Sequence, residues 1–237
     1  MKVEPLDVGS AADIRAQNAI PLASRYAERS TYELLRASAA AHADRPALTF
    51  LLRGTPDEDP LVYSYRDFVA RVNQAVNAFN RLGLGPGDAV AYLLPNLPQT
   101  HFTIWGGETA GRVAAVNPLL EPSQIGQILR AVRARVLVTL APGAPGLDLW
   151  AKCAPILGEV ESLEHVLCVD TADLVATDPS PRAYAPQGRV AVHDFDALLD
   201  REPDSRLDFT RHIAPDDIAS LFHTGGTTGM PKVAPHT

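Results

Sequence analysis

Residues 89–116 read AVAYLLPNLPQTHFTIWGGETAGRVAAV, and this stretch decides the fold class. It opens with an apolar segment, 89–94, that is typical of a buried strand, and it closes with a second such segment at 112–116. Residues 99–110, which lie between them, are expected to form a helix. A strand, a helix and a second strand in this order predict two parallel strands joined by a right-handed crossover.

The same alternation continues downstream. We expect helices at about 121–134, 147–157 and 195–200, and strands at 135–140, 164–169 and 218–222. Residues 171–188 contain three prolines and are expected to form a surface excursion. The alternation predicts an α/β fold, a mostly parallel sheet with helices on both faces.

Two N-cap signals define the upstream helices. Ser30 with Glu33 forms a capping box that predicts a helix to about Ala41, and Ser64 with Asp67 caps a second helix that ends near Leu82. Short strands are expected between them, at 46–52 and 62–63. The second helix places one apolar face at helical spacing, made of Phe68, Val72, Ala75, Val76 and Phe79.

Composition excludes several classes of protein. The chain has 237 residues, of which 46% are hydrophobic and 21% charged, as in a soluble globular protein of one or two domains. With 21 Lys and Arg against 28 Asp and Glu, the net charge is −7, which disfavours binding to nucleic acid or to an anionic membrane surface. No apolar run is long enough to span a bilayer, and no apolar signal segment follows Met1. We therefore expect a cytoplasmic protein.

The two cysteines predict neither a zinc site nor a disulfide scaffold. Cys153 and Cys168 stand apart, outside any CxxC motif or Cys/His cluster. Both are expected to be small core residues in a reducing compartment.

The most informative motif follows the last expected strand. It reads Thr224-Gly225-Gly226-Thr227-Thr228-Gly229-Met230-Pro231-Lys232. Glycines allow backbone N–H groups to approach an anion closely, threonine hydroxyls add donors, and lysine adds a mobile positive charge. This inventory predicts a loop that binds polyphosphate.

Two better-known phosphate motifs do not fit. A Walker A loop has Gly directly before Lys and Ser or Thr after it, whereas Pro231 precedes Lys232 here and Val233 follows it. A dinucleotide-binding fingerprint fails at 83–88, where Asp88 takes the place of the third glycine and a strand follows.

The motif resembles the phosphate-binding signature of the adenylate-forming, or AMP-binding, enzymes, which include the acyl-CoA synthetases. That signature reads roughly T-S-G-T-T-G-x-P-K-G-V. Upstream segments are similar to the family in the same order: 31–48, 63–88 and 94–118, the last ending in Asn117-Pro118. Two departures are Gly225, where the family usually has Ser, and Val233, where Gly is common.

The resemblance covers about residues 31–237 and implies an incomplete enzyme. We expect an N-terminal arm at 1–29, and at 30–237 the N-terminal portion of an AMP-binding domain, truncated just after the phosphate-binding loop. The family's Mg²⁺-ligating glutamate, ribose-binding aspartate and C-terminal catalytic lysine would all lie beyond Thr237. This chain alone is therefore expected to be inactive, and no metal ligand is assigned within it.

The resemblance also implies the reaction and the residues that serve it. The full-length protein would be an ATP-dependent carboxylic acid–CoA ligase that uses ATP, Mg²⁺ and CoA. It would form an acyl-adenylate, release pyrophosphate and then make a thioester, as in fatty acid metabolism. The acid substrate stays open: fatty, aryl and other carboxylic acids all fit the resemblance. The nucleotide-binding residues would be Thr224, Gly225, Gly226, Thr227, Thr228, Gly229 and Lys232. Thr224 would anchor the entry of the loop, and catalytic Lys232 would pair with the phosphates or steady the loop.

Two alternatives stay open at this point, and a third is disfavoured. The chain could be a non-catalytic nucleotide- or acyl-binding module, or an adenylating enzyme that loads a carrier protein instead of CoA. A phosphotransferase that forms ADP is disfavoured because the Walker A loop is missing. His223, where the family often has Tyr, is expected to pack or to orient the loop.

Overall fold

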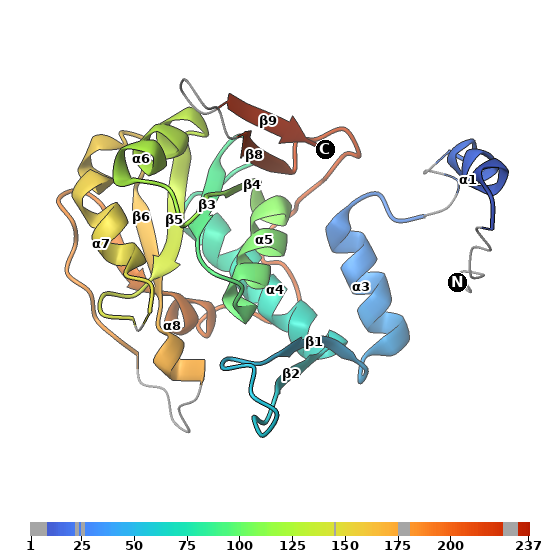
Figure 1. Cartoon of the computed structure of the whole chain (residues 1–237), viewed down its shortest axis with the longest axis horizontal. Coiled ribbons are helices and arrows are strands. Elements are labelled where there is room, and N and C mark those ends of the chain that lie inside the picture. Colours follow the sequence, from blue (N-terminus) through green and yellow to red (C-terminus); the bar gives the residue numbers. More distant parts are fainter. Residues whose placement is uncertain (1–8, 22–23, 25–26, 145, 175–180, 225–231) are drawn as a thin grey trace.

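A mixed sheet forms the centre of the molecule (Figure 1). The computed structural model describes residues 9–21, 24, 27–144, 146–174, 181–224 and 232–237. Within these residues the sheet has seven strands in the order β7-β6-β5-β3-β4-β8-β9. Neighbouring strands are parallel except for β8 and β9, which are antiparallel. The strands are β3 (Ala89–Leu93), β4 (Arg112–Ala115), β5 (Ala134–Leu140), β6 (His165–Val169), β7 (Ala191–Asp194), β8 (Ser220–Thr224) and β9 (Lys232–His236).

Helices cover both faces of this sheet, as the sequence predicts (Figure 1). One face carries α4 (Tyr65–Arg81), α5 (Pro98–Ala110) and α8 (Phe195–Leu199). The other carries α6 (Pro122–Ala131), α7 (Leu149–Cys153) and the 3₁₀ helix η1 (Ala154–Glu159). A second 3₁₀ helix, η2 (Thr171–Leu174), follows β6. The α/β prediction is therefore confirmed.

The N-terminal elements lie outside this layered core. Helix α3 (Thr31–His42) packs on α4 and α5, and β1 (Pro46–Phe50) pairs with β2 (Leu61–Ser64) in a separate antiparallel ribbon. Helix α1 (Ala11–Asn18) has no buried residue, and Figure 1 draws it apart from the sheet.

Helix α4 forms where its sequence predicts. Ser64 and Asp67 make the expected capping box, and the helix ends at Arg81, just before Gly83 at φ 83°. Its expected apolar face is buried in the core, where α4 packs against α5: Phe68, Val72, Ala75, Val76 and Phe79. A buried aromatic or aliphatic side chain of this kind contributes about 1.5–3 kcal/mol, so this face holds the α4 layer on the core.

The sequence missed several features, among them α1 within the expected arm and η2 within the expected surface excursion. Strands β7 and β9 were not expected, and both lie at edges of the sheet, where pairing depends on distant partners. Pro235 lies within β9, and an edge strand tolerates a proline because one side of it needs no donors. The expected helix at 147–157 is instead α7 followed by η1, which has Pro155 in its first turn.

Candidate nucleotide site at the carboxyl edge of the sheet

The carboxyl ends of β3, β4 and β8 lie side by side at one edge of the sheet. The chain leaves β3 into α5 on one face, and it leaves β4 into α6 on the other. Ligands of open α/β sheets bind where successive connections diverge in this way. Strand β8 lies directly beside β4, so the segment that follows β8 begins at this point.

The structure places the two ends of the predicted phosphate loop next to each other. Thr224 is the last residue of β8, Lys232 is the first of β9, and the two are Cα partners in the antiparallel ladder. The Lys232 side chain is exposed. The other predicted binding residues lie outside the described part of the chain: Gly225, Gly226, Thr227, Thr228 and Gly229. Their contact with phosphate stays a prediction.

A well-anchored turn lies beside the end of β8. Residues 117–120, called the β4 turn here, follow strand β4. The Asn117 side chain closes this turn, since its Oδ1 accepts from the Leu119 N–H at 2.9 Å. From α7, the Lys152 ammonium donates to the Pro118 and Leu120 carbonyls, at 2.9 and 3.2 Å. The turn therefore has a defined position relative to the sheet.

His223 connects β8 to this turn. The Asn117 backbone N–H donates to Nε2 of His223 at 3.2 Å, across 106 positions of sequence. The acceptor role requires an unprotonated Nε2. Burial lowers the pKa of His223, which favours the neutral ring that this contact needs. The expected loop-orienting role thus has a specific partner, one that sequence reasoning did not assign.

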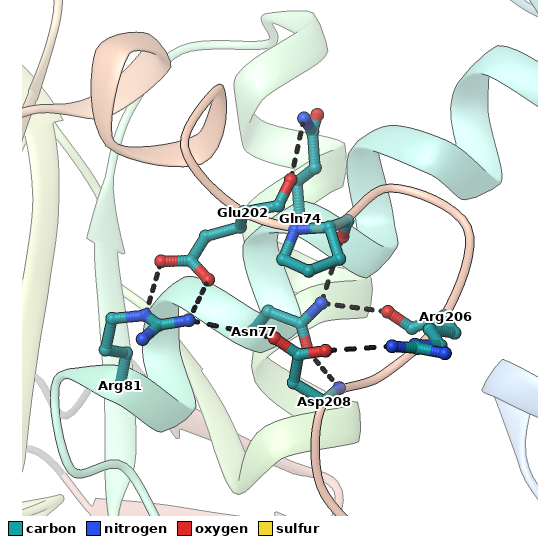
Figure 2. A network of polar contacts seen from close by, with 7 residues as sticks. Gln74, Asn77, Arg81, Glu202, Arg206 and Asp208 are labelled. Atoms are coloured by element: carbon teal, nitrogen blue, oxygen red, sulfur yellow. Dashed lines mark hydrogen bonds and ion pairs between the residues drawn. The ribbon is translucent and has the colours of Figure 1, made fainter.

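A long connecting segment, residues 200–219, brings the chain from α8 to β8 and crosses α4 on the way. Figure 2 shows how α4 holds it. The Asn77 amide donates to the Pro203 and Arg206 carbonyls, at 2.9 Å each, and its Oδ1 accepts from the Asp208 N–H at 2.9 Å. A single buried side chain therefore satisfies three backbone groups of the segment.

An ion pair adds to this network (Figure 2). The Arg81 guanidinium binds both oxygens of Glu202 at 2.7 and 2.8 Å, and the Glu202 side chain is only 3% exposed. Asn73 and Gln74 donate to further carbonyls of the segment, those of Asp204 and Glu202. The sequence carried a signal for this: two asparagines four residues apart, Asn73 and Asn77, lie next to the apolar face of an amphipathic helix, and both are buried.

Neither cysteine can serve as a nucleophile. Cys153 and Cys168 are both buried, and burial raises the pKa of each thiol to about 12. Thiolates are the reactive form, so both residues are inert at neutral pH. This confirms the expectation that they belong to the core.

The described residues contain neither a cluster of metal-ligating side chains nor a membrane-spanning helix. No group of three or more His, Cys, Asp or Glu side chains among them could hold a metal ion. No helix in the described ranges is long and apolar enough to cross a bilayer.

Known proteins resemble this chain along almost its whole length. It is 28% identical over 234 residues to the marinolic acid–CoA ligase of Pseudoalteromonas sp. (strain SANK 73390), covering 99% of this chain and 33% of that protein. It is 28% identical over 232 residues to the 4-coumarate–CoA ligase of Pinus taeda, covering 98% of this chain and 36% of the relative. The chain therefore spans about a third of the length of these relatives.

A solved structure shows the same architecture. The anthranilate CoA ligase AuaEII, crystallised with anthranoyl-AMP, matches 91% of this chain and 36% of its own, with a TM-score of 0.68 and 25% sequence identity. The family profile for AMP-binding enzymes matches residues 35–237. A match over this length, with the phosphate-loop motif between β8 and β9, shows that the chain belongs to the AMP-binding enzyme family.

Proposed function

We propose that this chain supplies the nucleotide-phosphate site of an ATP-dependent carboxylic acid–CoA ligase. The observation that supports this most directly is the Thr224–Lys232 pairing, which brackets the family's phosphate motif at the carboxyl edge beside β4. The relatives named above are themselves CoA ligases. We propose that the enzyme uses ATP and CoA as co-substrates and Mg²⁺ as cofactor. We also propose that the protein is cytoplasmic, where its buried thiols stay reduced.

The reaction has two steps. A carboxylate oxygen attacks the α-phosphorus of ATP, the bond to the bridging oxygen breaks, and pyrophosphate leaves with both electrons of that bond. The CoA thiolate then attacks the acyl carbon, a thioester forms and AMP leaves. The first step brings two anions together, so its rate depends on fixed donors and positive charge around the phosphates.

The chain's own residues would supply part of that charge. We propose that the backbone N–H groups of Gly225, Gly226 and Gly229 and the hydroxyls of Thr227 and Thr228 hold the β- and γ-phosphates. Thr224 anchors the loop at the end of β8, and Lys232, at the start of β9, pairs with the phosphates as they separate. The acid and the acceptor, CoA or a carrier-protein thiol, are selected outside these residues.

Lys232 gives the first test of this assignment. In the complete natural protein, we expect Lys232→Met to lower kcat/KM for ATP by roughly 10- to 100-fold, as for loss of a charge-assisted hydrogen bond. Arg66→Ala is the control, because it also removes one positive charge but lies in an exposed ion pair with Asp44. Equal activity of the two variants would contradict the assignment of Lys232.

Product analysis tests the reaction class. We expect AMP and pyrophosphate, formed only when a carboxylic acid is present, and a thioester when a thiol acceptor is added. The 237-residue chain alone should bind nucleotide without completing the thioester, since it spans about a third of its relatives. ADP as the product would support a phosphotransferase instead, and nucleotide binding without turnover in the complete protein would support a binding module.

A further inference from the structure

His223 lies immediately before the phosphate loop and reaches across to another strand's exit. It is the residue before Thr224 in β8, and its ring accepts the Asn117 N–H at 3.2 Å. The ring is partly buried, at a position where β8 lies between β4 and β9. The backbone ladder between β4 and β8 ends one residue earlier, at the pair Ala115 and Phe222. The side-chain contact therefore continues the strand pairing past the last paired residues.

The partner of His223 is itself fixed. Two carbonyls of the β4 turn accept from Lys152 of α7, and the Asn117 side chain closes the turn from within. The hydrogen bond from this turn to His223 therefore ties the end of β8 to a turn that α7 holds in place. A hydrogen bond to a freely moving loop would not have this effect.

The chemistry of the contact restricts what can replace His223. The donor is a backbone N–H, so the side chain at position 223 must present an acceptor at the reach of Nε2. A glutamine can present its Oε1 at a similar reach, whereas a phenylalanine fills the ring's volume without any acceptor. The two substitutions thus separate hydrogen bonding from packing.

We propose that His223 is a positioning residue for the phosphate loop: through Asn117 it fixes the end of β8, and so the place where Thr224 delivers the loop to ATP. This inference rests on the proposed function. It assigns His223 no direct role in the chemistry and no contact with the acid. Its loss should therefore affect the use of ATP selectively.

The test uses the complete protein and measures carboxylate-dependent ATP–pyrophosphate exchange. We expect His223→Phe to raise KM for ATP about 3- to 10-fold, the range for loss of one hydrogen bond, with KM for the acid and the thermal midpoint close to wild type. His223→Gln should restore KM for ATP to within about 2-fold. The two variants change the same position, and only the glutamine supplies a hydrogen-bond acceptor.

Three results would overturn the inference. His223→Phe could match wild type in KM for ATP; His223→Gln could be as impaired as His223→Phe; or His223→Phe could lower the thermal midpoint and leave KM for ATP unchanged, which indicates a packing role alone. Each result requires an active wild type. An inactive wild type would instead count against the proposed function, so the two failures are distinguishable.

Discussion

At the scale of single residues, the buried carboxyl group of Asp196 lies in surroundings that disfavour its charge. Its carboxylate, in α8, accepts from the Gln99 amide at 3.1 Å and lies 3.8 Å from the Arg71 guanidinium. Burial nevertheless raises the pKa of Asp196 to about 6, since desolvation outweighs the lowering by Arg71 and Gln99. This carboxyl group is therefore protonated more readily in the folded protein than in the unfolded chain.

The raised pKa of Asp196 predicts a pH-dependent stability difference. The folded state binds the extra proton, so this contribution to stability is complete below about pH 4 and is lost as pH rises through about 6. Asp196→Asn keeps an oxygen for Gln99 and never becomes charged. Its free energy of unfolding relative to wild type should rise by about 2 kcal/mol between pH 4 and pH 7.5.

Denaturant unfolding at the two pH values checks this. Asp57→Asn, an exposed position in the connection between β1 and β2, is the matched control. A difference between Asp196→Asn and wild type that stays constant with pH would show that burial does not govern this carboxyl group.

At the scale of elements, two adjacent glycines of α5 allow it to lie close to the sheet on one side and to α4 on the other. A Cβ at Gly107 would lie 2.4 Å from Val90 Cγ1 of β3 and 3.2 Å from Val113 Cβ of β4. A Cβ at Gly106 would lie 2.8 Å from the Ala75 Cβ of α4. Gly107 thus allows α5 to lie against β3 and β4, and Gly106 allows α5 to lie against α4.

Gly107→Ala should therefore destabilise the protein despite the better helix propensity of alanine. We expect a loss of about 1–3 kcal/mol in the free energy of unfolding, as for overpacking of a core. Gly158→Ala is the control, because a Cβ there meets nothing within 4 Å, and its effect should stay within about 0.5 kcal/mol. Equal stability of the two variants, measured by denaturant unfolding, would refute this account of the α5 packing.

Elements with a local signal are the ones that the sequence predicts well. Helix α4 has a capping box and a continuous apolar face, and the strands β3 to β6 are short segments of mostly apolar residues. Strands β7 and β9 have four and five residues, and β9 exists through pairing with β8. The Asn117–His223 contact joins residues 106 positions apart. No local pattern in the chain encodes such a contact, so the site's motif was predictable and its support was not.

At the scale of the whole molecule, the connecting segment 200–219 links the two ends of the sheet. It starts after α8, near β6 and β7, and it delivers the chain to β8 beside β4. Its first half is held by α4 through Asn77 and the Glu202–Arg81 pair (Figure 2). In its second half, the Arg211 guanidinium donates to the Thr109 carbonyl of α5 at 3.1 Å. The position of β8 thus depends on α4 and α5, which lie on the same face of the sheet.

Asn77→Ala should loosen this arrangement. It leaves two carbonyls and one N–H of the segment without their partner, so we expect a loss of about 2–4 kcal/mol in the free energy of unfolding. Faster hydrogen exchange in β8 should accompany it. Asn80→Ala, on the same helix at a half-buried position, is the control. Unchanged exchange in β8 would show that the segment does not position that strand.

We propose above all that the complete protein forms an acyl-adenylate at the carboxyl edge beside β8. Carboxylate-dependent ATP–pyrophosphate exchange tests it most directly, with short, medium, long and aromatic acids offered in turn to the complete protein. We predict exchange that requires a carboxylic acid and is strongly reduced in Lys232→Met. Intact ATP binding without exchange for any acid would contradict the claim.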